Sequence, residues 1–171
     1  MPEQTRGATS AMQLQTIADE LVSEVQRLPP ALITWVPGEG VWSVMDNLCH
    51  IREFVPFWTS QVVRIAQRPN EQWGRDHTDT ARLAAVTNTA SYELDEVLSD
   101  IRRAVKQSAD TLKDLSDADL AVEATSRNPR WGLKPASFVV DDLLVHHVAK
   151  HLGQIRRNVT QYAEAQTRPP V

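Results

Sequence analysis

Apolar residues recur at helical spacing in four segments of the chain. In the first, from about Ser10 to Leu28, they are three or four positions apart and therefore share one helical face: Leu14, Ile17, Leu21, Val25 and Leu28. Pro29 and Pro30 follow at once, and a proline breaks the helical hydrogen-bond ladder because it has no N–H to donate. This pattern predicts an amphipathic helix that ends before Pro29.

The second segment opens with a helix-capping signal. Ser43 is followed three positions later by Asp46, which resembles a capping box with Asp in place of the usual Glu or Gln. The helix is predicted to run to about Gln67 through an apolar set: Leu48, Ile51, Phe54, Phe57, Trp58, Val62 and Ile65. Pro56 lies inside it and leaves the carbonyl of Arg52 without a donor, so we expect a kink there.

The third segment has the most regular pattern. Its seam alternates by four and three positions and has Ser108 as its only polar member: Leu94, Leu98, Ile101, Val105, Ser108, Leu112 and Leu115. A stretch rich in turn-forming residues, 116–135, separates it from a fourth predicted helix, which runs from about Ala136 to Ala165.

These four helices predict the fold class. None can bury its apolar stripe alone, so they must share one core. The connections of roughly 15 to 20 residues are longer than those of simple up-and-down bundles, which favours crossovers. We predict an all-α four-helix bundle with long crossover connections, as one domain over residues 10–165, with flexible ends at 1–9 and 166–171. No strand-like alternation competes with this interpretation.

Composition and charge narrow the function classes. The formal net charge of −4 is not clustered, so neither a nucleic acid nor an anionic membrane is expected as a partner. No apolar run approaches the ~20 residues that span a bilayer, and the first residues lack the apolar core of a signal peptide. The single cysteine, Cys49, fits a reducing compartment. We therefore expect a cytoplasmic protein.

Two of the five histidines form a pair on the fourth predicted helix. His147 and His151 are four positions apart and point the same way, whereas His146 lies about 100° around the helix from His147. The row that holds the pair also contains Leu144 and Ile155, so it should face the core. A buried imidazole needs a hydrogen-bond partner or a metal, because an unsatisfied polar group costs ~1–3 kcal/mol.

A metal site would need a further ligand from elsewhere in the chain. His50, on the second helix, is the candidate, while His77 lies in a polar connection where we expect it to be solvated. The alternative is that these are ordinary histidines of a packed core with hydrogen-bond partners. Cys49 points away from its neighbour His50 and is more consistent with a packed thiol than with a ligand.

The order of three sequence elements resembles the DinB family of four-helix-bundle metalloenzymes. The elements are VWSVMDNLCHIRE at the start of the second helix, LKDLSDADLA at the end of the third and VHHVAKHLGQI within the fourth. Together they span most of the chain. The resemblance implies the same bundle, with His50, His147 and His151 as the ligands of one divalent metal.

The same resemblance suggests two catalytic candidates. Glu53 stands where the family commonly has Asp and would orient an imidazole or act on a metal-bound water; a solvent-facing acid paired with Arg52 or Arg64 is the alternative. Gln154 either contacts a substrate or caps a polar pocket. Three neutral imidazoles suit zinc, nickel or iron, and the sequence does not choose among them.

The leading functional hypothesis follows from the family. Relatives are associated with the transfer of low-molecular-weight thiols to electrophiles, so we expect a metal-dependent thiol S-transferase of the detoxification type with a small-molecule substrate. The alternatives are a metal-dependent hydrolase with Glu53 as base, and a non-catalytic, stress-associated binding or assembly module. A homodimer is an open alternative to a monomer.

Overall fold

Four long helical rods build the protein, as the periodicity predicts. The structure is a computed structural model that describes residues 5–167, so residues 1–4 and 168–171 of the predicted flexible ends, 1–9 and 166–171, lie outside the described residues. The first three rods are α1 (Arg6–Val25), α3 (Val44–Gln67) and α5 (Leu94–Lys113). The fourth joins α7 (Ala136–Phe138), a π-helical segment η2 (Val139–Val145) and α8 (His146–Thr167). The all-α four-helix bundle is confirmed.

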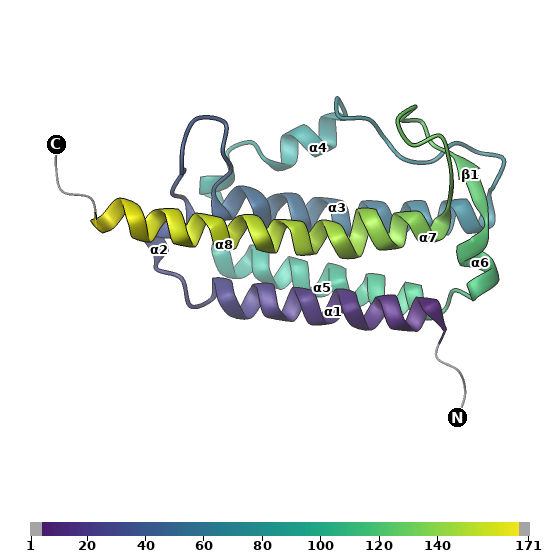
Figure 1. The fold of residues 1–171 in the computed structure, drawn as a ribbon, viewed down its shortest axis with the longest axis horizontal. Helices are drawn as coiled ribbons and strands as arrows, with labels where there is room; N and C mark the ends of the chain where they lie inside the picture. The colour runs from purple at the N-terminus through teal and green to yellow at the C-terminus, as the bar shows by residue number, and fades with distance from the viewer. Residues whose placement is uncertain (1–4, 168–171) are drawn as a thin grey trace.

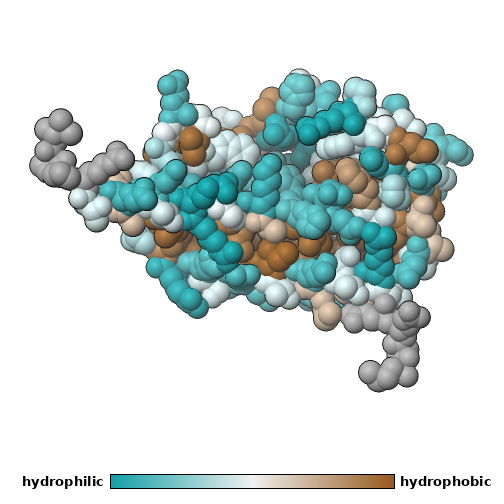
Figure 2. All heavy atoms as spheres, viewed as in Figure 1, coloured by the Kyte–Doolittle hydropathy of each residue, from teal (hydrophilic) through white to brown (hydrophobic). Residues whose placement is uncertain are grey.

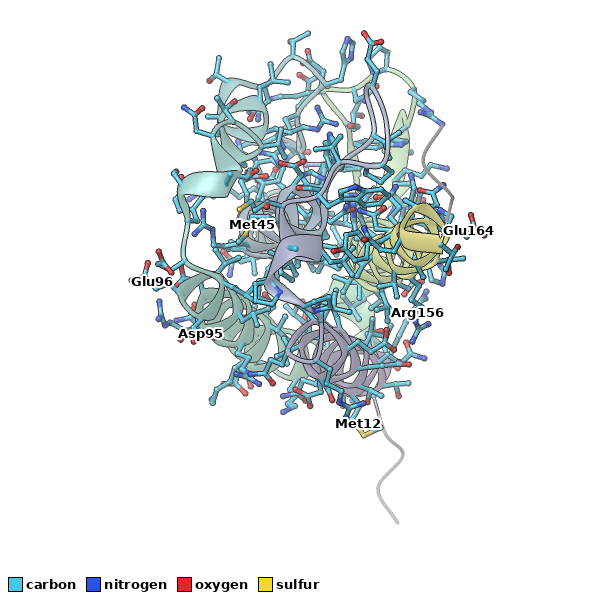
Figure 3. All side chains as sticks on the ribbon, turned by 90° about the vertical axis from the view of Figure 1, so that its left-hand side faces the viewer. Met12, Met45, Asp95, Glu96, Arg156 and Glu164 are labelled. Carbon is cyan, nitrogen blue, oxygen red and sulfur yellow. The ribbon has the colours of Figure 1, made fainter. Side chains whose placement is uncertain are left out.

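The rods are arranged with crossover connections. Extensive contacts join α1 with α5, α5 with α3, α3 with the fourth rod and the fourth rod with α1. The rods therefore form a square in which α1 is diagonal to α3, and α5 is diagonal to the fourth rod. Figure 3, which looks along the bundle, shows this square. In Figure 1, α1 and α8 run in one direction and α3 and α5 in the other. The long connections are needed because two of the three links must cross the bundle.

The helix starts are fixed by side-chain caps. Ser43 and Asp46 form the predicted capping box, in which each side chain accepts a hydrogen bond from the other residue's backbone N–H. Helix α1 begins at Arg6, earlier than the predicted Ser10, because the Thr5 hydroxyl accepts a hydrogen bond from the backbone N–H of Ala8. Helix α3 continues through Pro56, and the kink expected there stays a prediction.

The connections contain more structure than predicted. They hold the helices α2 (Pro30–Ile33), α4 (Thr80–Ala85) and α6 (Asp117–Ala121) and the 3₁₀ turn η1 (Thr89–Ser91). They also hold an antiparallel pair of strands, β1 (Glu123–Thr125) and β2 (Leu133–Pro135), which the sequence pattern did not predict. Strands of three residues are too short for an alternating pattern to show in the sequence.

Trp73 ties the strand pair to the connection between α3 and α4. Its indole N–H donates a hydrogen bond to the carbonyl of Ala124 at 2.8 Å, and its backbone N–H donates to Thr125 at 3.1 Å. The ring is fully buried and stacks on Trp131 at 5.6 Å between centroids. The two longest connections therefore support one another, and both lie above α3 and the fourth rod in Figure 1.

One apolar core runs along the bundle. The predicted seam of α5 is buried from Leu98 to Leu112. Its polar member, Ser108, is hydrogen bonded to the hydroxyl of Thr59 on α3 at 2.7 Å, so the polar group is satisfied. Figure 2 shows the exterior, where hydrophilic side chains cover the outer face of α8. Within residues 5–167, no helix combines the length and apolar character needed to cross a membrane.

A close approach of the α1 and α5 backbones at Gly7 makes a testable prediction. A Cβ added at the buried Gly7 would lie 2.2 Å from the carbonyl oxygen of Leu112, a backbone atom that cannot rotate away. Gly7→Ala should therefore lower the free energy of unfolding by about 1–3 kcal/mol, seen as an earlier urea midpoint.

A second glycine provides the matched control. At Gly153 in α8 the nearest atom to an added Cβ is the Nη1 of Arg157 at 3.8 Å, an ordinary contact. Gly153→Ala should raise the free energy of unfolding by about 0.5–1 kcal/mol, because alanine loses less backbone entropy in a helix. Equal midpoints for the two variants would contradict the packing described here.

Candidate metal centre

The three histidines predicted as ligands converge inside the bundle. His50 comes from α3, and His147 and His151 come from successive turns of α8. One ring nitrogen from each lies within 4.8 Å of those of the other two. The exposed fractions of His50 and His151 are 3% and 4%, and His147 is half-buried. The three centroids are separated by 4.8 to 5.3 Å.

The π-helical segment η2 sets the rotation of the fourth rod before the histidine pair. Here the backbone N–H of His146 bonds to the carbonyl of Asp141, five residues back, instead of four. The buried pairs Val139–Val140 and Leu144–Val145 are likewise five positions apart. The wider turn keeps both pairs in the core and still delivers His147 and His151 to the face toward α3.

Each of these imidazoles has one buried nitrogen without a hydrogen-bond partner. The three atoms are Nδ1 of His50, Nδ1 of His147 and Nε2 of His151. Such atoms cost ~1–3 kcal/mol each when nothing satisfies them. Three imidazoles with free nitrogens fit a divalent transition metal, whose tetrahedral bonds of about 2.0–2.1 Å would draw the donor nitrogens closer together. The chemistry of the site is consistent with a metal.

Asn47 fixes the tautomer of His151. The amide nitrogen of Asn47 donates to the carbonyl of Ser43 at 2.8 Å, so its Oδ1 is the atom that faces Nδ1 of His151 at 2.7 Å. Because Oδ1 only accepts, Nδ1 must carry the proton. The lone pair of His151 is then on Nε2, the nitrogen without a partner, where a metal would need it.

Aromatic rings hold the imidazole planes. Phe54, one turn after His50, stacks on His147 with centroids 4.0 Å apart and an angle of 13° between planes. Trp42 stacks on His151 at 5.9 Å and meets the edge of His50 at 5.1 Å. These contacts limit rotation of the three rings and exclude water from one side of the cluster.

Burial keeps the three imidazoles neutral. It lowers the pKa of His50 to about 2, that of His151 to about 3 and that of His147 to about 4, because a charged ring would lose its hydration. Neighbouring imidazoles and nearby cations lower the pKa of His50 further. At neutral pH all three therefore keep a lone pair available for a metal.

Two cavities meet at the cluster. The first, here called the Gln154 cavity, measures about 390 Å³ and is lined by Trp42, Asn47, Gln154 and all three histidines, among others. The second, the Trp131 cavity, measures about 460 Å³ and extends from His50 and His147 toward Trp131 and the strand pair. Both volumes fall in the range of small-molecule sites. Their shared wall consists of His50, His147, Arg82 and Lys150.

The two catalytic candidates occupy different settings. Gln154 lines the Gln154 cavity. Glu53 instead forms a two-pronged ion pair with the buried Arg75, with both N–O distances 2.6 Å, and not with Arg52 or Arg64. Among the described residues, neither cavity wall includes Glu53. Catalytic roles for both residues stay predictions.

The remaining sequence candidates lie apart from the cluster. His77 is exposed in the rim of the Trp131 cavity, and His146 is exposed beside Asp142. Cys49 is fully buried among apolar residues, which raises the pKa of its thiol and fits a packed side chain.

Sequence reasoning missed the residues that support the cluster. Asn47 is one turn before His50, and that spacing was the available signal for its place beside the site. Arg82 comes from α4, in a connection with no long-range pattern, so the sequence offered no signal for its place in the cavity wall. The sequence likewise offered no signal that Arg75 forms an ion pair with Glu53.

Comparisons with known proteins agree with this architecture. The model of the DinB superfamily matches residues 13–155. The solved structure of YfiT from Bacillus subtilis, described as a probable metal-dependent hydrolase with an unusual four-helix bundle topology, superimposes with a TM-score of 0.77 at 11% sequence identity. That match covers 95% of this chain and 93% of YfiT. No curated protein sequence matches the chain significantly.

The role assigned to Asn47 predicts a loss of metal affinity when its side-chain oxygen is removed. Asn47→Leu should weaken zinc binding by about 10- to 100-fold, because His151 loses the partner that fixes its tautomer and orientation. The measurement is competition for zinc with a chromogenic chelator.

Thr59→Val is the matched control. It removes a buried hydrogen bond on the same helix without touching a histidine, so it should destabilise the protein and leave zinc affinity unchanged. Wild-type affinity in Asn47→Leu would show that the contact with His151 is unimportant for the metal.

Proposed function

The chain belongs to the DinB superfamily, and on that premise we propose that it is a metal-dependent enzyme that transfers a low-molecular-weight thiol to a small electrophile. His50, His147 and His151 hold the ion, which is zinc, nickel or iron. The observation that carries the metal is the set of three buried ring nitrogens, one from each histidine, that lack hydrogen-bond partners. An ordinary core would not leave a buried nitrogen without a partner on each of three imidazoles whose ring centroids are 4.8 to 5.3 Å apart.

Three protein ligands leave a coordination position free for a reactant. When bound, a divalent ion on three neutral imidazoles acidifies a thiol or a water that reaches it, which makes that molecule a nucleophile at neutral pH. The chain's own contribution is geometry: Asn47 and Trp42 orient His151, and Phe54 orients His147. The surrounding aromatic wall limits access of bulk water.

The pair of cavities favours a reaction between two substrates. A hydrolase needs room for one organic substrate, because its second reactant is water. Here the Gln154 cavity and the Trp131 cavity approach the histidines from two directions, and each is large enough for a small molecule. In the proposed transfer, the thiol sulfur forms a bond to the electrophilic carbon, the leaving group departs with its electron pair, and the thiol proton passes to solvent.

Glu53 and Gln154 receive roles in this proposal. Gln154 contacts the substrate that occupies its cavity, since its amide both donates and accepts hydrogen bonds. Glu53 positions Arg75, which lies over the ring of Phe57 at 3.8 Å and lines the Trp131 cavity. An acid held in a two-pronged ion pair is poorly placed to accept a proton, which argues against Glu53 as a general base.

Metal-dependent hydrolysis is the second candidate. It is favoured by the likeness to YfiT, which is described as a probable metal-dependent hydrolase. In this case water takes the place of the thiol, and the cavities hold the two sides of one substrate. A homodimer is a further proposal that neither chemistry requires.

Metal content tests the ligand set. His147→Ala should lose most of the metal that the wild-type protein holds, because a removed imidazole leaves two ligands. His146→Ala is the matched control, since His146 is the adjacent residue and is exposed. The measurement is elemental mass spectrometry on protein purified without a histidine tag. Full metal content in His147→Ala would remove the proposed centre.

Product analysis separates the two chemistries. The metal-loaded protein, given chlorodinitrobenzene and mercaptoethanol, should release chloride and form the thioether faster than the metal-free protein and faster than His147→Ala. Thr59→Val, which changes a residue outside both cavity walls, should match the wild type. Turnover of nitrophenyl esters that requires metal but no thiol, without thioether formation, would replace transfer by hydrolysis.

A further inference from the structure

Three cationic side chains line the Gln154 cavity, and none of them pairs with a carboxylate among the described residues. Arg82 reaches it from α4, and Lys150 and Arg157 reach it from α8, two turns apart. Within residues 5–167, none of the three forms an ion pair; the side chain of Arg82 donates a 3.2 Å hydrogen bond to the carbonyl of His77, and its backbone N–H donates to Asp79. The described lining of this cavity contains no acid.

This arrangement differs from that of two other arginines near the site. Arg75 is neutralised by Glu53 and Asp79. Farther along α8, Arg156 is held by Glu20 and Glu24 of α1; Figure 3 shows its side chain at the edge where these helices meet. Arg157, the next residue, has no such partner and lines the cavity instead. The unpaired charge is therefore concentrated where a ligand would bind.

The remaining groups of the cavity do not offset this charge. The three imidazoles are neutral, and Gln154, Asn47 and Trp42 carry no charge either. A divalent ion would add to the positive potential. Positive potential in a recess with low-dielectric walls attracts anions and raises their local concentration.

The two ends of the cavity differ in chemistry. The histidine cluster lines its buried part, the exposed side chains of Lys150 and Arg157 line its outer part, and the half-buried Arg82 is close enough to His50 and His147 to lower their pKa. Figure 2 shows hydrophilic side chains gathered over α4 and α8 on this face. A molecule that fits must present a metal-seeking group to the histidines and negative groups to the three cations.

We propose that the Gln154 cavity selects an anionic thiol, a small molecule whose sulfur reaches the histidine cluster while its carboxylates pair with Arg82, Lys150 and Arg157. This proposal rests on the proposed thiol transfer and names the charge class of the thiol. Arginine binds a carboxylate through two parallel N–H groups, and lysine adds a point charge. The Trp131 cavity, whose wall mixes acids and bases, is left for the electrophile.

The test is a titration of the cobalt-loaded protein with thiols of different charge under anaerobic conditions. The series is mercaptosuccinate, mercaptopropionate, mercaptoethanol and cysteamine, with two, one and no carboxylates and finally an ammonium. Sulfur binding is followed by the thiolate-to-cobalt absorption band. The dissociation constant should fall by roughly tenfold for each added carboxylate and be highest for cysteamine, with differences that shrink as salt is added.

The variant that carries Arg82→Gln, Lys150→Gln and Arg157→Gln together should abolish this order. It should keep its cobalt content and its affinity for mercaptoethanol, because none of the three residues belongs to the ligand cluster. Arg102→Gln is the matched control: Arg102 also lacks an ion pair among the described residues but lies on α5, near Gln26. It should preserve the charge preference.

The outcomes separate this proposal from the proposed function. No cobalt binding, or no absorption band with any thiol, would overturn the thiol-transfer function and this inference with it. A band with all four thiols at equal affinity would leave thiol binding intact and overturn only the selection by charge. Persistence of the charge order in the triple variant would show that the selecting groups are elsewhere, which also overturns the assignment.

Discussion

The structure depends on a constraint that three buried imidazoles impose on two helices. Each ring has a polar nitrogen without a partner in the core, and removing the rings from water keeps them neutral. A core that only needed to be stable would hold apolar side chains there. The surrounding residues instead support the arrangement: Asn47 fixes one tautomer, and Trp42 and Phe54 fix ring planes. The contact between α3 and α8 is organised around these polar groups.

The crossover topology determines what surrounds that contact. In the square of rods, α3 and the fourth rod are neighbours, while α1 and α5 close the opposite side with apolar packing. Two long connections then lie over the α3 side, as Figure 1 shows, and are tied together by Trp73. An up-and-down bundle with short loops would have no such cover. The connections supply Arg75, Arg82 and Trp131 to the two cavities. The topology therefore brings together the two helices that carry the histidines and also provides the cavity walls around them.

The sequence predicted the parts of this protein that depend on short-range spacing. Helical periodicity located all four rods, the Ser43–Asp46 cap located one helix start, and the i, i+4 rule placed His147 and His151 on one face. It did not predict the π-helical turn, because apolar pairs five apart are also compatible with one broad α-helical face. It missed the strand pair, because strands of three residues are too short for an alternating pattern to be recognised. The partnership of Glu53 with Arg75 and the position of Arg82 arise from long-range packing, which a single sequence does not encode locally.

The ion pair between Glu53 and Arg75 shows how the charges of the site are divided. Arg75 is among the few buried charged residues, and burying an unpaired guanidinium would be very costly. Glu53 offsets that cost by pairing both of its carboxylate oxygens with Arg75. Because both oxygens are engaged, Glu53 is poorly placed to act as a general base. Two of the cations without an ion pair among the described residues, Lys150 and Arg157, are exposed, where a charged side chain stays hydrated and accessible to a ligand. Positive charge is thus neutralised in the interior and left unpaired along the wall of the Gln154 cavity, an arrangement that favours ligand recognition over structural support.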